Sequence, residues 1–339
     1  MKAKLSHTIN MNHLKISILV PVYGAEKYIS RCVRSLFGQT YDNIEFVFVN
    51  DCTPDRSIEI LKSVLKDYPQ RQSQARIISH DKNRGVAATR NTLLDNATGD
   101  YILWVDADDF IELRTAETLA YEAAKNKADI ICFGAIKHTK RWDKSVNNNF
   151  TDDKKEFIRK ILEGKISSVL WDKMFKLSMI ADNNIRFVPG VEIGEDAIFI
   201  IKTVWAPHRI IQINENLYHY DATNNSSITH AYSERNKNAE LEYVQQVETF
   251  LNDKIDVEEI LDVIRINARL SQMYNACRID DRNFYEEAKS AYRAIRQKNV
   301  KPTKSKLYLF FAVCNIFVIN RIWAWILCMI KRLYGSRLR

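Results

Sequence analysis

The stretch YILWVDADD, residues 101–109, decides how the chain is expected to fold. Its first five residues are apolar, which is typical of a buried β-strand. Asp106, Asp108 and Asp109 follow directly, and carboxylates this close repel one another unless a cation or hydrogen bonds hold them. Side chains at positions i and i+2 of a strand end point to the same side, so Asp106 and Asp108 can face one Mg²⁺ or Mn²⁺ ion. The alternative is an acidic helix start, which suits Asp109 best.

Strand and helix patterns alternate on both sides of this stretch. The expected strands cover 15–22, 44–49, 76–79, 101–105 and 129–134. The expected helices cover 25–37, 85–97 and 113–126, with a fourth that starts at Thr53-Pro54 and runs to about residue 68. Continuous apolar strands joined by helices predict an α/β fold with a mostly parallel sheet covered on both faces.

Polar or special residues follow four of the expected strands. Ligands of such sheets bind outside the carboxyl ends of the strands, so these four segments are expected to form one site. They are PVYGAE (21–26), VNDCTPD (49–55), SHDKNRG (79–85) and VDADD (105–109).

The net charge of +8 is concentrated at the C-terminal end. Residues 301–339 carry eight basic residues and no acidic one, which leaves 42 basic and 42 acidic residues in 1–300. A nucleic-acid-binding protein usually spreads a basic face over its folded domain, so this distribution argues against nucleic acid as a partner. A basic tail mixed with apolar residues indicates an anionic membrane surface instead.

The order of the motifs resembles the inverting family-two glycosyltransferases with the GT-A fold, of the bacterial cell-surface polysaccharide type. Four motifs lie in the first 110 residues: PVYGAEKYISRCVRSLFGQTY, VNDCTPDRS, NRGVAATRN and DADD. Two later ones are LWDKMFK (170–176) and FVPGVEIGEDAIF (187–199), and YHYDATNNSSIT (218–229) is similar to the final loop of the family. The resemblance covers about residues 15–230 and implies a Rossmann-like, mostly parallel sheet with flanking helices.

The resemblance also implies a role for each matching residue. Asp196, in the Glu195-Asp196 pair, is expected to be the general base, and Asp108, with Asp106, is expected to bind Mn²⁺ or Mg²⁺. Three further residues are candidate contacts to the acceptor or the phosphates: Glu195, Trp171 and His219, the last also as a third metal ligand. The expected nucleotide-binding residues are Pro21, Val22, Tyr23, Glu26, Asp51, Arg90 and Asp106.

Plain structural roles stand beside these assignments. Asp51 can cap the next turn, Glu195-Asp196 can be an acidic first helical turn, and Arg90 can be a solvated helix residue. Trp171 is expected to serve packing more than stacking on an acceptor. The chain also departs from the family pattern: Cys52 stands where Gly is frequent, Asn50 where a second Asp is frequent, Thr89 where Ala is common, and Asp221 where many relatives have Arg.

The segment LYLFFAVCNIFVINRIWAWILCMI, residues 307–330, is long enough to span a bilayer as a helix. Arg321, near its middle, is costly in a span, and both flanks are basic. Helices lying in the membrane surface are therefore favoured over a span, and over a buried helix in an oligomer.

Together with the acidic cluster and the basic tail, the resemblance implies a metal-dependent inverting enzyme that moves a sugar from a UDP-sugar to a hydroxyl of a membrane-borne glycan, such as a lipopolysaccharide, capsule or exopolysaccharide precursor. Six scattered cysteines and no visible secretory signal place the expected enzyme at the cytoplasmic face of the inner membrane, peripheral or monotopic. The expected divisions are a flexible 1–14, a catalytic domain at 15–232, a helical extension at 233–300 and a membrane-associating tail at 301–339. The rivals are a nucleotidyltransferase on a related fold and a non-catalytic sugar-nucleotide-binding scaffold.

Overall fold

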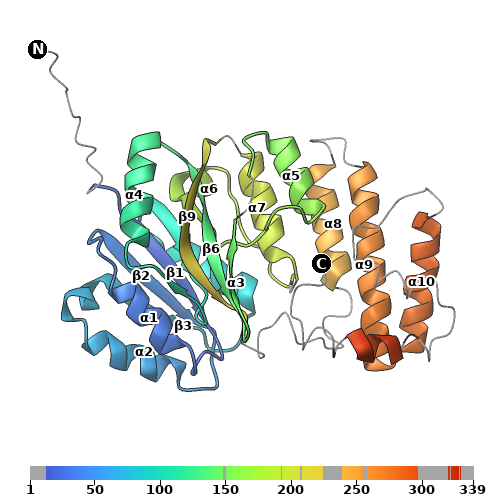
Figure 1. The fold of residues 1–339 in the computed structure, drawn as a ribbon, viewed down its shortest axis with the longest axis horizontal. Helices are drawn as coiled ribbons and strands as arrows, with labels where there is room; N and C mark the ends of the chain where they lie inside the picture. The colour runs from blue at the N-terminus through green and yellow to red at the C-terminus, as the bar shows by residue number, and fades with distance from the viewer. Residues whose placement is uncertain are drawn as a thin grey trace, which may run out of the picture. The chain divides into compact units, whose positions relative to one another are not determined.

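The computed structural model describes residues 13–147, 150–191, 193–206, 208–223, 239–252, 254, 258–296, 320, 322–327 and 329. The chain divides into two compact units, each taken by itself below. The first unit comprises Met1–Phe157, Ser168–Gly190 and Phe199–Asn224. The second comprises Ile158–Ser167, Val191–Ile198 and Asn225–Arg339. Figure 1 shows a sheet with flanking helices in the first unit and a group of helices in the second.

The first unit is built on one mixed sheet (Figure 1). Its order is β3-β2-β1-β4-β8-β6-β9-β5, with β7 paired to β6. The pairings make β1, β2, β3, β4, β6 and β9 run in one direction and β5, β7 and β8 in the other. The strands are β1 (Ile16–Val22), β2 (Ile44–Asn50), β3 (Ala75–Ser79), β4 (Tyr101–Trp104), β5 (Phe110–Ile111), β6 (Ile130–His138), β7 (Asp143–Val146), β8 (Lys173–Lys176) and β9 (Ile210–Asp221).

The prediction of a mostly parallel sheet is confirmed for the five predicted strands, which all run the same way. It is wrong for β8, which lies antiparallel between β4 and β6, and it missed the hairpin partner β7. Strand β8 is only four residues long, so its sequence carries too short a pattern to show which neighbours it joins.

Four helices were predicted with bounds, and all four are shorter than predicted. They are α1 (Ile29–Phe37), α2 (Ser57–Lys66), α3 (Val86–Asn96) and α4 (Thr115–Asn126). The 3₁₀ helix η1 (Pro69–Gln74) and the helices α5 (Lys154–Leu162), α6 (Leu177–Asp182) and α7 (Glu195–Trp205) complete the set up to residue 205. The predicted start of α2 at Thr53-Pro54 is wrong. Asp55 accepts hydrogen bonds from the backbone N and Oγ of Ser57 at 3.1 and 2.6 Å, so residues 53–56 form a separate turn before the helix.

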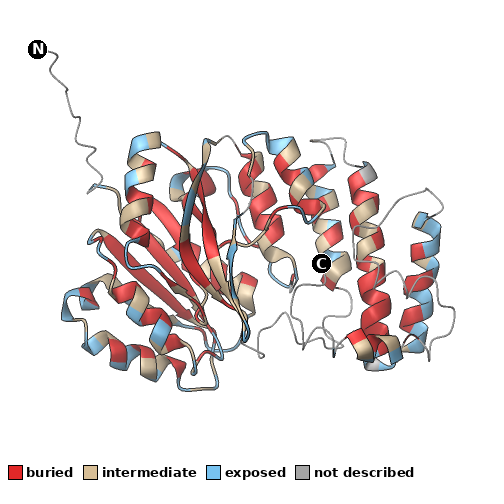
Figure 2. Cartoon of the chain, in the orientation of Figure 1, coloured by how far each residue is buried: buried red, intermediate tan, exposed pale blue. Residues whose placement is uncertain are grey.

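The core of the first unit lies on the buried strands β1, β2 and β4, whose residues are mostly red in Figure 2. One buried carboxylate interrupts it. Glu45, on β2, accepts hydrogen bonds from Ser17 Oγ at 2.5 Å and from the backbone N of Thr98 at 2.6 Å. Next to it, a Cβ on Gly99 would lie 2.7 Å from the carbonyl oxygen of Lys15, so this position needs glycine for close approach to β1.

In its described part, the second unit contains three helices within the predicted helical extension 233–300. They are α8 (Ala239–Leu251), α9 (Glu258–Ile279) and α10 (Arg282–Arg296). Apolar side chains of α9 and α10 form a core with Ala324 and Leu327. Among the described residues, every helix is too short or too polar to traverse a lipid bilayer. Most of the expected span, 307–330, lies outside the described residues.

Candidate active site

The loops after β1, β2 and β3 are joined at one edge of the sheet, as expected for neighbouring parallel strands. The backbone N of Gly24 donates to Thr53 Oγ1 at 2.8 Å, which links the first loop to the second. Glu26 accepts from Nε and Nη2 of Arg56 at 2.9 and 2.6 Å, a paired contact that adds a second link. The backbone N of Arg56 also donates to Glu26 Oε2 at 3.1 Å, and this bond, followed by the side-chain bonds, holds the pKa of the Glu26 carboxyl below its usual value.

The predicted base-pocket residues differ in exposure. Tyr23 is 49% exposed, and Pro21 and Glu26 are half-buried. Val22 is fully buried in the core, so its side chain faces away from solvent. Any contact from Val22 to a ligand would therefore come from its backbone, whose carbonyl oxygen already accepts from the backbone N of Asp51 at 3.1 Å.

Asp51 is buried and organises the loop after β3. Its Oδ1 accepts from the backbone N of Arg84 at 2.8 Å and lies 2.7 Å from Nδ1 of His80. Its Oδ2 accepts from the backbone N of Gly85 at 2.9 Å. Asp51 therefore does not cap the turn that follows it. It ties the second strand end to the NRG segment, where Gly85 has a φ of 84°.

His80 is a site residue that the sequence reasoning missed. It is buried, and its Nε2 lies 3.0 Å from Thr92 Oγ1 on α3, so the ring bridges Asp51 and that helix. The available signal was its position directly after a predicted strand, in SHDKNRG.

The acidic stretch forms a tight turn beyond β4 and not an extended strand end. The strand ends at Trp104, and the backbone N of Asp109 donates to the carbonyl oxygen of Asp106 at 3.0 Å. Asp106 and Asp108 are both half-buried. We call residues 106–109 the acidic turn.

Asp109 plays a different part from its two neighbours. It is fully buried, and it accepts hydrogen bonds from the hydroxyl of Tyr218 at 2.7 Å and the backbone N of Asp221 at 2.8 Å. Burial, and then the charges of Asp108 and Asp106, raise the pKa of the Asp109 carboxyl well above its usual value. The alternative of an acidic helix start at Asp109 is wrong, because the next helix begins at Thr115.

Two arginines bring positive charge to the acidic turn. Arg90, buried on α3, has Nη2 3.8 Å from Asp106 Oδ1, and its guanidinium carbon lies 5.5 Å from the ring centre of Phe187. It is therefore not a solvated helix residue. Arg31, on α1, donates to the carbonyl oxygen of Asp108 at 2.9 Å, and the sequence reasoning missed it.

Trp171 lies flat on two tyrosines of β9. Its ring centre is 4.6 Å from that of Tyr218 and 5.7 Å from that of Tyr220, with interplanar angles of 12° and 13°. The side chain is half-buried, so packing accounts for one face of the indole. The adjacent Lys173 is buried, and its Nζ donates to Asp172 Oδ1 at 2.5 Å and to the carbonyl oxygen of Val169 at 2.8 Å.

His219 belongs to a stacked pair of imidazoles. Its Nδ1 lies 2.9 Å from Nε2 of His138, and its Nε2 lies 2.7 Å from Glu112 Oε1. The ring stacks on Phe110 with 4.3 Å between centres. Both ring nitrogens of His219 thus have protein partners. A phosphate or a metal could contact this residue only by displacing His138 or Glu112.

Glu195 and Asp196 occupy the first turn of α7 and belong to the second unit. Both are half-buried. The preceding Gly194 has a φ of 81°, and a Cβ there would lie 2.5 Å from Cδ2 of Tyr243. The helix start is thus fixed by a position that only glycine fits, while the approach of Asp196 to a sugar remains a prediction.

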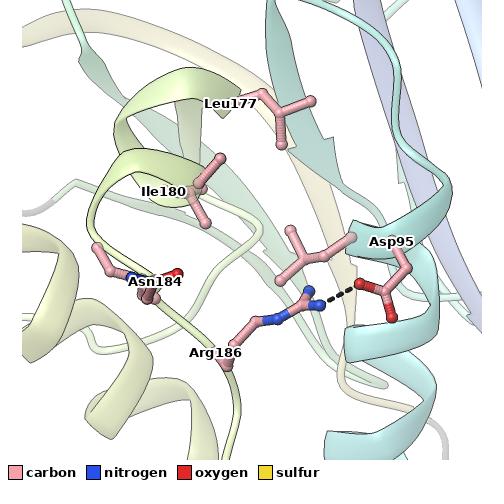
Figure 3. Close-up of a pocket in the computed structure, with 8 residues that line it drawn as sticks. Asp95, Leu177, Ile180, Asn184 and Arg186 are labelled. Carbon is pink, nitrogen blue, oxygen red and sulfur yellow. Dashed lines mark hydrogen bonds and ion pairs between the residues drawn. The ribbon is translucent and has the colours of Figure 1, made fainter.

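A hollow of about 260 Å³ lies between α3 and α6 in the first unit (Figure 3). Asp95 and Arg186 form an ion pair at its wall, over apolar residues that include Leu177 and Ile180. None of the predicted site residues lines it. We therefore do not assign the nucleotide or the sugar to this hollow.

The acidic turn has the donor chemistry that Mg²⁺ or Mn²⁺ requires. Asp106 and Asp108 carry carboxylate oxygens, which hard cations prefer. Asp109 accepts hydrogen bonds from Tyr218 and Asp221. Within the described ranges, no three or more His, Cys, Asp or Glu side chains form a metal-holding group. A metal here would thus have two protein carboxylates and would need further oxygens from a substrate, the usual arrangement for Mg²⁺ beside phosphates.

A mixed sheet of this kind, with an aspartate turn beyond its fourth strand, is the arrangement of the GT-A fold that the solved structures below share. The family model "Glycosyl transferase family 2" matches residues 17–182. "Putative glycosyltransferase EpsH" of Bacillus subtilis is 30% identical over 250 residues, covering 72% of this chain and 71% of EpsH. The chain belongs to glycosyl transferase family 2.

Other relatives and solved structures agree on the fold. "Poly(ribitol-phosphate) beta-N-acetylglucosaminyltransferase TarS" of Staphylococcus aureus is 26% identical over 209 residues, which are 61% of this chain and 35% of TarS. The crystal structure of S. aureus TarS 1–349 in complex with UDP-GlcNAc has a TM-score of 0.57 at 19% identity and covers 84% of this chain and 92% of that one. The mannosyltransferase PcManGT from Pyrobaculum calidifontis, in complex with GDP-Man and Mn²⁺, has a TM-score of 0.52 at 16% identity and covers 96% and 88%.

Proposed function

We propose that this glycosyltransferase is a metal-dependent, inverting enzyme that moves a sugar from a UDP-sugar to a hydroxyl of a membrane-borne glycan. The observation that carries the proposal is the acidic turn beyond β4, which offers Asp106 and Asp108 and places Asp106 beside Arg90. The structure of TarS with UDP-GlcNAc supports UDP as the nucleotide, and the Mn²⁺ of PcManGT supports a divalent metal.

The proposed nucleotide site uses the loops after β1, β2 and β3. Tyr23 and the backbone of Pro21 and Val22 would line the base pocket, and Glu26 would lie near the ribose. Asp51 would accept a hydrogen bond from the uracil ring through Oδ2, which accepts one protein donor against two contacts at Oδ1.

The acidic turn would hold the diphosphate. Asp106 and Asp108 would bind Mn²⁺ or Mg²⁺, and Arg90 would stabilise Asp106 or approach the phosphates. When bound, the divalent ion would offset the negative charge of the leaving diphosphate.

Asp196 would act as general base on the acceptor. The acceptor hydroxyl would lose its proton to the Asp196 carboxylate while its oxygen forms a bond to the anomeric carbon. The bond from that carbon to the diphosphate oxygen breaks, and its electron pair leaves with UDP. Attack opposite the leaving group inverts the anomeric centre. Glu195, Trp171 and His219 remain proposed contacts to the acceptor or the phosphates.

The acceptor is proposed to be a precursor of a cell-surface polysaccharide at the cytoplasmic face of the membrane. The name of TarS, a poly(ribitol-phosphate) beta-N-acetylglucosaminyltransferase, supports a polymer acceptor of this class. The catalytic part would be residues 15–232, followed by a helical extension at 233–300. An oligomer is compatible with this proposal.

The tail 301–339 is proposed to bind an anionic membrane surface. In its described helical part, Ile322, Trp325 and Met329 are 57%, 65% and 42% exposed. These positions repeat every three to four residues and so share one side of a helix, while Ala324 and Leu327 are buried against α9 and α10. An exposed apolar stripe within a basic segment is the pattern of an interfacial helix.

Thermal stabilisation by nucleotides tests the proposal. A ligand that binds only the folded protein raises the melting temperature by mass action. We expect a shift with UDP plus Mn²⁺ that is larger than with GDP plus Mn²⁺ or with UDP alone, and that is lost in Asp108→Asn. The surface variant Asp67→Asn is the matched control.

Turnover separates an enzyme from a binding scaffold. Asp196→Asn should keep the UDP–Mn²⁺ shift and lose sugar transfer by about 10²-fold or more, whereas Asp182→Asn, an exposed substitution at the end of α6, should change neither. Full retention of sugar transfer in Asp196→Asn would show that Asp196 is not the general base. No shift with any nucleotide in folded wild type would favour the scaffold.

A further inference from the structure

We propose that Arg31 and Asp221 form a clasp that positions the acidic turn for metal binding. It rests on the function proposed above, because it adds positioning residues to the same site. Arg31 lies near the start of α1, and Asp221 is the last residue of β9. The two residues come from elements that lie 190 positions apart in the chain and meet beside Asp108.

Three contacts hold the guanidinium of Arg31 in one orientation. Nη2 donates to Asp221 Oδ2 at 2.6 Å and to the carbonyl oxygen of Asp108 at 2.9 Å. The guanidinium carbon lies 4.5 Å from the ring centre of Phe110, so the planar group also rests on an aromatic face. A charge-assisted hydrogen bond to a main-chain carbonyl fixes the peptide that carries Asp108 more firmly than a neutral one would.

Hydrogen bonds to Thr223 and Asp109 fix the position of Asp221. Its Oδ1 accepts from the backbone N and Oγ1 of Thr223 at 2.9 and 2.5 Å, and its side chain is 7% exposed. Its backbone N donates to Asp109 Oδ1 at 2.8 Å. The contacts therefore close a ring from Arg31 to Asp108, along the chain to Asp109, across to Asp221, and back to Arg31.

This ring explains how three neighbouring carboxylates are kept in one tight turn. Like charges at this spacing repel, and the repulsion favours an open turn in which the carboxylates move apart. Arg31 places a positive charge against the turn and binds its main chain, so that both carboxylates of a metal site can stay close before the metal arrives. Preorganisation of this kind lowers the metal concentration needed for binding.

An ordinary surface ion pair is the alternative, and the chain contains a matched example. Arg34, one turn further along α1, pairs with Asp67 at 3.1 Å, and both side chains are at least half exposed. No contact of this pair reaches the acidic turn among the described interactions of Arg34. Exposed pairs of this type contribute little to stability, so Arg34→Gln is the control for Arg31→Gln.

The test is a metal titration read out by melting temperature. Wild type, Arg31→Gln, Asp221→Asn, the double variant and Arg34→Gln are each titrated with MnCl₂ at one fixed UDP concentration. We expect the half-saturating Mn²⁺ concentration to rise about tenfold in each clasp variant, equivalent to about 1.4 kcal/mol. The double variant should be no worse than either single one, because both remove the same ring. Arg31→Lys, which keeps the charge, should recover part of the loss.

Two results would overturn the clasp. One is an Arg31→Gln titration that superimposes on wild type, even if its melting temperature without ligand is lower, because the residue would then be structural only. The other is a double variant whose loss is the sum of the single losses, which would show that the two residues act separately. If wild type itself shows no Mn²⁺-dependent response to UDP, the proposed function fails and the clasp fails with it.

Discussion

Tyr218 and Asp109 are joined by a buried hydrogen bond of 2.7 Å from the tyrosine hydroxyl to the carboxyl oxygen Oδ2. The same hydroxyl accepts from the backbone N of Asp106 at 3.1 Å. Since Trp171 stacks on the Tyr218 ring, one side chain connects the acidic turn to the aromatic stack on β9. Removing the hydroxyl oxygen of Tyr218 should therefore change both the acidic turn and the aromatic stack on β9.

Tyr218→Phe tests this connection. It leaves Asp109 Oδ2 and the backbone N of Asp106 without that partner in a buried setting, which should lower the free energy of unfolding by about 1–3 kcal/mol. It should also weaken the Mn²⁺-dependent response to UDP. Urea unfolding and the metal titration measure the two effects. Tyr121→Phe, at an exposed position on α4, is the control, and equal small losses in both variants would contradict the role of the hydroxyl.

Glu45 should make the first unit sensitive to acid. Burial raises the pKa of the Glu45 carboxyl, but hydrogen bonds from Ser17, Thr98 and Lys15 outweigh burial and lower that pKa from its ordinary 4.5 to about 2. Because the folded pKa is the lower one, this stabilisation is complete above about pH 4.5 and is lost as the pH falls toward 2.

The comparison of Glu45→Gln with wild type isolates that contribution. At neutral pH the variant should be less stable by about 2–3 kcal/mol. The difference should shrink between about pH 4.5 and pH 2, as followed by urea unfolding at several pH values. Glu59→Gln, an exposed change on α2, should show no such convergence. A constant difference across this range would mean that packing and not charge makes Glu45 important.

Cys52 adopts a φ of 55°, in the left-handed region that favours glycine. Its side chain is exposed, so a smaller residue there leaves no cavity. Cys52→Gly should raise the free energy of unfolding by about 1 kcal/mol by removing the Cβ strain, although the added freedom of the unfolded chain offsets part of the gain. Cys52→Ala keeps the Cβ and should show no gain, so an equal gain in both would point to the thiol instead.

The exposed stripe of the tail should bind lipid. Trp325→Ala and Ile322→Ala should reduce co-sedimentation with vesicles of phosphatidylcholine and phosphatidylglycerol, and vesicles without phosphatidylglycerol should retain less of the wild type. Leu113→Ala removes an equally exposed apolar side chain from the first unit and should leave binding unchanged. If Trp325→Ala and Ile322→Ala co-sediment with vesicles as much as the wild type does, the stripe has no role in membrane binding.

The sequence predicted the elements whose patterns are local and repeated. The predicted strand 44–49 is apolar except for Glu45, and the stretch 101–105 is recognisable because its carboxylates follow at once. The roles of Asp51 and Asp109 were less visible, because they depend on partners such as His80 and Tyr218 that lie 29 and 109 positions away. The role of Arg31 could not be predicted, because arginines are common on helix surfaces and its partners Asp108 and Asp221 are distant in sequence. The antiparallel direction of β8 could not be predicted either, because its four residues do not show which strands they join.

The antiparallel strand β8 has a consequence for how the chain is made. Strands β1 to β4 can pair with one another once residue 104 has left the ribosome. The other edge of β4 pairs with residues 174–176 of β8, which are synthesised later. During synthesis, about seventy residues must emerge while that edge stays open to other chains. Substitutions that weaken β8 should therefore reduce the yield of soluble protein more than they reduce the stability of the protein that has folded.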